Sequence, residues 1–186
     1  QLPLESVSGG AIFPVGTFLA ILFNNWWVLL ACFLIALLAG GLYAATFNHE
    51  YALDDGIVIV KNQYVQEGVS GIGKILSRDT YDSYLRQMQA RNQLAGGRYR
   101  PLSVVTFAIE QQFFGDAPHL RHLLNVLLFA VTGVVLLLLL RRHLFPDRPD
   151  VAFLAPLLFA LHPIHTEVVA NIKSRDELLS LLFLKT

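Results

Sequence analysis

The sequence predicts an all-α polytopic membrane protein. Of its 186 residues, 54% are hydrophobic and only 15% are charged, whereas soluble domains carry about 25% charged residues. The stretch from Trp26 to Phe47 holds no charge, and as a helix it would extend ~33 Å, enough to cross a bilayer. The formal net charge is zero, so we expect no nucleic-acid partner. The single cysteine, Cys32, lies inside this stretch, which excludes a disulfide framework and a cysteine metal site.

The N-terminal half divides at this hydrophobic stretch. Residues 1–24 are partly apolar but are interrupted by Pro14, so we expect an interfacial or re-entrant segment. Transmembrane helix 1 is predicted over 25–47, because Trp26-Trp27 fits an aromatic belt at its start. The chain begins without Met and stops within an apolar stretch, so we expect a fragment of a larger protein.

Residues 48–118 hold most of the charge and are predicted to form a long external loop with interfacial helices. The segment from Pro101 to Phe114 is apolar but carries Glu110. It is too short to span a bilayer, so we expect a helix that lies on the membrane surface.

The C-terminal half contains transmembrane helix 2 over 119–142, a cytoplasmic loop over 143–150 and transmembrane helix 3 over 151–169. The uncharged part of helix 3, Val151 to Leu161, covers only ~16 Å, so the helix either continues through His162-Pro163 or stops partway. Residues 170–186 are predicted to start a truncated transmembrane helix 4.

The basic residues of the short loop predict the orientation of the helices. Arg141, Arg142 and Arg148 favour the cytoplasmic side. By alternation, the 48–118 loop and the segment 162–177 lie together on the opposite side. That side would then hold Asp54, Asp55, Arg98, Arg100, His162, His165, Glu167, Lys173 and Arg175.

The pair Asp54-Asp55 follows the first hydrophobic helix and would lie at the membrane surface. A partly desolvated carboxylate there could act as a general base towards a hydroxyl acceptor, and a neighbouring acid could tune its pKa or help bind a cation. An Asp-Asp-Gly turn that opens a solvated loop is the competing interpretation.

Basic side chains supply the expected contacts to phosphate. Arg98 and Arg100 suit bidentate contacts with phosphate oxygens, although anchoring to lipid headgroups would explain them equally. Lys173 and Arg175 lie near a predicted helix start, which also favours anions. Ser174 and Glu177 there have the spacing of a capping box.

His162, His165 and Glu167 fall within six residues. This cluster could hold a divalent metal ion, or it could hydrogen-bond a phosphate or a sugar. Pro163 disfavours a helical conformation at His162, so the three residues need not share one helical face. No metal site or cofactor is firmly predicted, and a divalent cation stays an open alternative.

The order of these motifs resembles the GT-C superfamily of glycosyltransferases. More narrowly, it is similar to the membrane part of the transmembrane-and-TPR-repeat O-mannosyltransferases and their bacterial relatives, over about residues 45–184. The matching segments are Leu53-Asp54-Asp55, Tyr99-Arg100-Pro101-Leu102, His119 to Asn125, His162-Pro163-Ile164-His165-Thr166-Glu167 and Ser174-Arg175-Asp176-Glu177-Leu178-Leu179.

The resemblance implies the N-terminal part of a GT-C fold. It further implies transfer of mannose or another hexose from a polyprenyl-phosphate donor to Ser or Thr of exported proteins. Asp54 matches the acid expected to act as the base, and Asp55 matches the second acid. Arg98, Arg100, His162, His165, Glu167, Lys173 and Arg175 are assigned, by their chemistry, to the donor phosphate or sugar.

Two other functions stay open at this point: transfer of a sugar to a lipid or glycan, and a non-catalytic membrane subunit of a larger complex. The resemblance places the site on the periplasmic face of a bacterial inner membrane or, alternatively, on the lumenal face of the endoplasmic reticulum. The expected partners are therefore the lipid-linked sugar, an acceptor protein, the bilayer and, in the subunit alternative, other membrane subunits.

Overall fold

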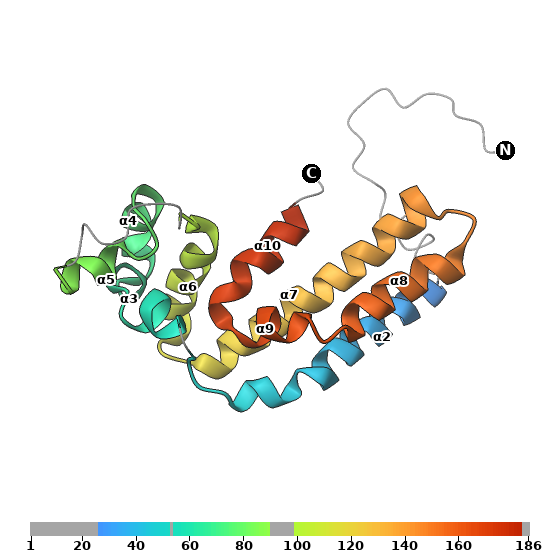
Figure 1. Ribbon diagram of the computed structural model, residues 1–186, viewed down its shortest axis with the longest axis horizontal. Coiled ribbons are helices and arrows are strands. Elements are labelled where there is room, and N and C mark those ends of the chain that lie inside the picture. Colours follow the sequence, from blue (N-terminus) through green and yellow to red (C-terminus); the bar gives the residue numbers. More distant parts are fainter. Residues whose placement is uncertain (1–25, 53, 90–98, 184–186) are drawn as a thin grey trace, which may run out of the picture.

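The computed structural model describes residues 26–52, 54–89 and 99–183, with side chains from residue 30 onward. These residues form helices and turns, and no strand occurs among them. Figure 1 shows two regions, a set of long helices and a cluster of short ones, with the C-terminal helices between them. The all-α prediction is therefore confirmed for the described part of the chain.

The long helices form the first region, called here the bundle. It consists of α2 (Trp26–Leu42), α7 (Pro118–Leu139) and α8 (Pro149–Leu161), and α7 packs against both of the others. Small side chains permit this close approach, because Ala31 and Ala39 of α2, together with Ala160 of α8, are buried among larger apolar residues. The bundle thus has its own apolar core.

One helical stretch of the described residues, Pro118–Leu144, is long and apolar enough to cross a membrane. It joins α7 to a wide turn over Leu140–Leu144. Two shorter apolar stretches, Leu30–Leu42 and Pro149–Leu161, lie beside it. These findings support a membrane protein.

The expected single helices over 25–47 and over 151–169 are each divided in the structure. Helix α2 ends at Leu42 and is followed by a 3₁₀ turn over Ala44–Asn48. Helix α8 ends at Leu161, because His162 precedes a proline and adopts an extended conformation. The chain turns there and continues as α9 (His165–Ala170).

The short helices form the second region, called here the loop region. They are a π-helical turn (Gly56–Val60), α3 (Gln63–Gln66), a 3₁₀ turn (Gly68–Gly71), α4 (Ile72–Ser77), α5 (Asp82–Gln87) and α6 (Pro101–Phe114). Their core includes Val58, Ile59, Val65, Ile75 and Phe107. The predicted interfacial helix corresponds to α6, whose buried face packs against α3 and α4.

The C-terminal segment connects the two regions. After α9 the chain forms a short 3₁₀ turn (Ile172–Ser174) and then α10 (Arg175–Phe183). Helix α10 contacts both α6 and α7. Ile172 is buried in the core of the loop region, whereas Leu178 is buried in the core of the bundle. This segment therefore fixes the loop region against the bundle, beside Asp54-Asp55.

Candidate active site

The two neighbouring acids occupy different environments. Asp55 is fully buried, and its carboxylate accepts hydrogen bonds from the backbone N–H of Lys173 (2.7 Å) and that of Ala52 (3.3 Å). Burial raises the pKa of Asp55, and these N–H groups oppose the rise. Asp55 thus binds the start of the loop region to the C-terminal segment.

Asp54 instead keeps 45% of its side chain exposed. Its Oδ2 accepts hydrogen bonds from the Lys173 ammonium (2.8 Å) and from the Tyr81 hydroxyl (3.2 Å). The hydrogen bond to Asp54 is the main cause that raises the pKa of Lys173, so this lysine is a cation at neutral pH. Lys173 therefore contacts both acids, one through its backbone and one through its side chain.

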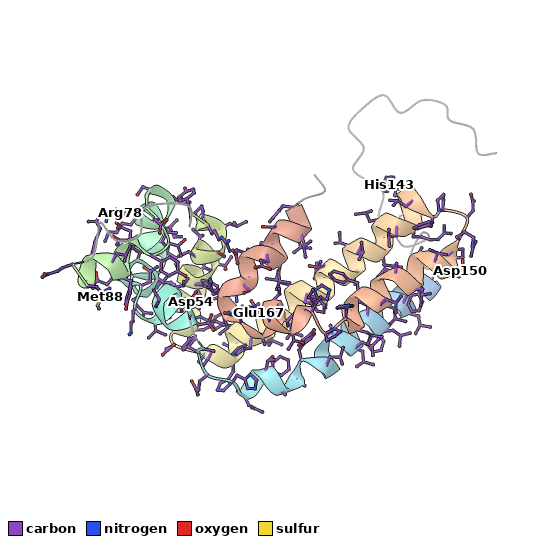
Figure 2. The ribbon with its side chains drawn as sticks, viewed as in Figure 1. Asp54, Arg78, Met88, His143, Asp150 and Glu167 are labelled. Carbon is purple, nitrogen blue, oxygen red and sulfur yellow. The ribbon has the colours of Figure 1, made fainter. Side chains whose placement is uncertain are left out.

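A polar cleft of about 150 Å³ lies in front of Asp54. Arg100 and Lys173 contribute two cationic side chains to it. In the structure each cation is paired with an acid, since Arg100 forms an ion pair with Asp176 and Lys173 forms one with Asp54. Figure 2 shows Asp54 where the loop region meets the rest of the molecule, far from His143 and Asp150.

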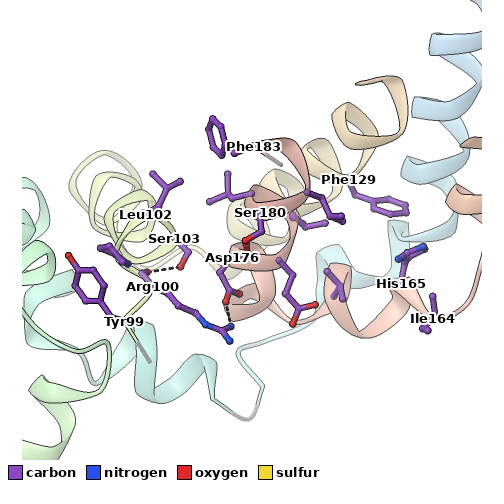
Figure 3. A pocket seen from close by; sticks show the side chains of 16 residues that line it. Tyr99, Arg100, Leu102, Ser103, Phe129, Ile164, His165, Asp176, Ser180 and Phe183 are labelled. Atoms are coloured by element: carbon purple, nitrogen blue, oxygen red, sulfur yellow. Dashed lines mark hydrogen bonds and ion pairs between the residues drawn. The ribbon is translucent and has the colours of Figure 1, made fainter. Parts of the chain in front are cut away.

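A larger apolar groove of about 810 Å³ adjoins the cleft. Arg100, Ser103 and Asp176 line both cavities. The side chains that line the groove come mainly from α6, α9 and α10, and Figure 3 shows the Arg100–Asp176 ion pair between them. Apolar groups such as Leu102, Leu179 and Phe183 form much of its surface. Charged groups thus lie at one part of a long apolar surface.

Arg175 does not line either of these cavities. Its side chain is buried and donates hydrogen bonds to Asn125 Oδ1 (2.8 Å), Thr106 Oγ1 (3.0 Å) and Glu110. A further bond reaches the Arg121 carbonyl (3.2 Å), so four of the five N–H donors of a guanidinium are used. Burial lowers the pKa of Arg175 and raises that of Glu110.

The three residues of the predicted histidine cluster lie in different surroundings. The rings of His162 and His165 are 6.2 Å apart, and no group of three potential metal ligands occurs in the described part of the chain. His165 packs against Phe159, with ring centroids 4.2 Å apart, and lines the apolar groove. His162 accepts a hydrogen bond from the Ile164 backbone, while Glu167 is exposed.

The structure thus unites Asp54, Asp55, Arg100 and Lys173 at one place. Arg175 is buried beside them without lining the cleft, and of the histidine cluster only His165 lines the adjoining groove. Arg98 lies outside the described residues. Sequence reasoning missed Tyr81 and Asp176 as members of the cleft. Nothing in the local pattern marks Tyr81, whereas the neighbouring motif residues Lys173 and Arg175 could have drawn attention to Asp176.

Known proteins show what this arrangement is similar to. Protein O-mannosyl-transferase TMTC1 of Homo sapiens is 35% identical over 153 residues, which cover 80% of this chain and 17% of that protein. Protein O-mannosyl-transferase F38B6.6 of Caenorhabditis elegans is 32% identical over 143 residues, covering 76% and 20%. Protein O-mannosyl-transferase TMTC3 of Mus musculus is 45% identical over 85 residues, covering 46% and 9%.

The chain therefore spans a fifth or less of the length of these three relatives. No family model matches it, and no solved structure does so either. The resemblance that the motifs predict is nevertheless confirmed: over most of its own length, the chain is a homologue of the TMTC protein O-mannosyl-transferases.

Proposed function

We propose that the complete protein is a membrane glycosyltransferase that moves mannose or another hexose from a polyprenyl-phosphate donor to Ser or Thr of exported proteins. One observation carries the proposal. A half-exposed carboxylate, Asp54, shares a polar cleft with two cations, and this cleft adjoins an apolar groove. The names of the relatives supply the mannosyl group and the protein acceptor.

The two cavities together suit a donor with a charged head and a long apolar tail. In this proposal the phosphate lies between Arg100 and Lys173, the sugar faces Asp54 and the polyprenyl chain follows the apolar groove. Guanidinium and ammonium groups both bind phosphate oxygens well. Because both cations are paired with carboxylates, an incoming phosphate competes with Asp54 for Lys173.

That competition prepares Asp54 for reaction. Once Lys173 turns towards the phosphate, the Asp54 carboxylate takes the proton of the acceptor hydroxyl. The hydroxyl oxygen forms a bond to the anomeric carbon, and the bond from that carbon to the phosphate oxygen breaks. Polyprenyl phosphate leaves with the electron pair, and Arg100 and Lys173 stabilise its charge.

The remaining motif residues have supporting roles in this proposal. Asp55 positions Lys173 by accepting a hydrogen bond from its backbone N–H. Arg175 positions α10 against α6 and α7 through its buried contacts. His165 forms part of the groove wall that receives the donor tail. His162 and Glu167 line neither the cleft nor the groove, so we assign them no donor contact.

The relatives reported above come from animals. This origin supports the endoplasmic reticulum membrane, with the site facing the lumen, over the bacterial inner membrane. The bilayer then presents the lipid-linked donor to the groove, and the acceptor protein approaches from the lumen.

Replacing Asp54 by Asn in the complete protein tests the proposal. The amide keeps the shape of the side chain but cannot accept the proton, and loss of a general base typically costs about 10²- to 10⁴-fold in rate. We therefore expect hexose transfer to a Ser/Thr acceptor, followed by intact mass, to fall by about that factor at unchanged expression. Asp150→Asn is the matched control, because this exposed acid lies at the far end of the molecule.

Near-wild-type transfer by Asp54→Asn would overturn the assignment of the base. A different outcome would overturn the protein acceptor instead: the parent protein transfers hexose only to a lipid acceptor, and Asp54→Asn abolishes that transfer.

A further inference from the structure

Tyr81 is held in place from two directions. Its ring is buried, with 7% exposed, in the core of the loop region beside Val58, Ile75 and Val104. Its backbone N–H donates to Asp79 Oδ1 at 2.9 Å, which forms a turn just before α5. A buried aromatic side chain with two rotatable bonds has little freedom once it is packed. The hydroxyl of Tyr81 therefore has a fixed position.

That fixed hydroxyl lies in the polar cleft and donates to Asp54 Oδ2 at 3.2 Å. The Lys173 ammonium donates to the same oxygen at 2.8 Å. One donor is thus part of a rigid core, whereas the other is a flexible side chain with 30% of its surface exposed. The two donors must respond differently when a phosphate enters the cleft.

A phosphate attracts the Lys173 ammonium because opposite charges attract, whereas the Tyr81 hydroxyl carries no charge and its buried ring holds it beside Asp54. When Lys173 moves to the phosphate, Tyr81 keeps its contact with Asp54 Oδ2. A hydrogen bond to the ionised carboxylate favours the charged form and restricts its rotation. Asp54 consequently stays ionised and oriented at the moment when it has to accept a proton.

We propose, on the basis of the function proposed above, that Tyr81 is the positioning residue of the catalytic base. Its hydroxyl holds the Asp54 carboxylate towards the acceptor, and Lys173 is released to serve the donor phosphate. No sequence motif points to Tyr81, and the assignment rests on the contact between the buried core and the cleft.

The test is Tyr81→Phe in the complete protein, with kcat, KM and the pH dependence of kcat/KM measured for hexose transfer. We expect kcat to fall about tenfold, the size of one hydrogen bond to a charged group, at unchanged KM for the donor. The acidic limb of the pH profile should move to higher pH by about half a unit to one unit, because the ionised base loses a donor.

Tyr64→Phe is the matched control. Tyr64 is 6% exposed, belongs to the same apolar core and donates its hydroxyl to Asp82 Oδ2 at 2.7 Å. It does not line the cleft. We expect Tyr64→Phe to lower the melting temperature at least as much as Tyr81→Phe does, while kcat and the acidic limb stay in place.

The outcomes separate this inference from the proposed function. Transfer that survives Asp54→Asn overturns both. Transfer that is lost in Asp54→Asn but keeps its rate and acidic limb in Tyr81→Phe overturns the role of Tyr81 alone. A shifted acidic limb in Tyr64→Phe also overturns it. Should Tyr81→Phe fold poorly, its effect in the Asp54→Asn background decides, with the rate taken per folded molecule: a further fall in that rate overturns the role, and an unchanged rate supports it.

Discussion

The polar cleft and the buried cluster around Arg175 lie side by side but differ in what their charges can do. In the cleft, Lys173 and Asp54 are each partly exposed and form an ion pair. In the buried cluster, Arg175 and Glu110 are almost fully enclosed, and the guanidinium also contacts Asn125, Thr106 and the Phe107 ring. The first arrangement can exchange partners with a ligand, whereas the second cannot do so without unfolding.

This difference distinguishes the roles of two charged motif residues that look equivalent in the sequence. Lys173 and Arg175 are two positions apart, and both suit phosphate by their chemistry. The turn over Ile172–Ser174 and the start of α10 direct them to different sides. One side chain enters the cleft, and the other inserts between α6 and α7.

The largest expected effect comes from Arg175→Met, which leaves Glu110 buried without its main partner. Breaking a buried ion pair in this way typically costs about 3–5 kcal/mol. We expect a steep fall in the melting temperature and in the yield of folded protein, measured by size-exclusion chromatography in detergent with increasing temperature.

The double variant Arg175→Met with Glu110→Gln sharpens this result. Removal of both charges relieves the buried carboxylate that has lost Arg175, and Arg121, which also pairs with Glu110, keeps Asp116 and Gln111 as partners. Such double replacements are often close to neutral. We expect recovery of most of the lost stability together with hexose transfer. A double variant that is stable but inactive would contradict the positioning role and would instead favour direct contact between Arg175 and the donor.

The sequence predicted that the acidic pair lies near Lys173, but it did not predict every residue that lines the cleft. The hydrophobic stretch before Asp54-Asp55 and the basic loop after helix 2 predicted that Asp54 and Lys173 lie on the same side of the membrane. Their 2.8 Å contact agrees with that placement. Hydropathy and charge patterns carry this information because they depend on long stretches of sequence.

The parts that sequence reasoning missed depend on packing between distant segments. Tyr81, just before α5, reaches Asp54 because it shares the core of the loop region with Val58 and Ile59 of the turn at Gly56–Val60. Glu110 is a buried partner because α6 packs against α10, although α6 contains no other charged residue. Neither contact has a local signature, since each depends on tertiary structure.

A smaller effect is expected for Lys173→Met, which acts on the cleft without disturbing the fold. The variant keeps the backbone N–H that binds Asp55 and loses only a partly exposed ion pair, which contributes little to stability. Loss of one cation that stabilises the leaving phosphate should lower kcat about 10²-fold. Lys74→Met is the control, because Lys74 forms an exposed ion pair with Glu67 away from the cleft.

Melting temperatures near that of the parent protein, together with a large loss of transfer, would show that Lys173 acts on the reaction. A large loss of stability in Lys173→Met would place this lysine with Arg175 and would remove the contrast between the two regions.

The smallest effect is expected in the apolar groove, where Leu102→Asp changes one contact of the donor tail. Leu102 is half exposed on α6 and lines the groove next to Arg100. A buried methylene group contributes ~0.8 kcal/mol, so loss of one such contact should raise KM about fourfold for a long-chain polyprenyl-phosphate donor. A sugar-phosphate donor without a polyprenyl chain, which has no tail to contact Leu102, should be used equally well by the variant and by the parent protein. Leu76→Asp is the matched control, because Leu76 is equally exposed in the same region and lines neither cavity.

An equal rise in KM for both donors would show that the change disturbs Arg100 and the phosphate, and it would place the donor tail elsewhere.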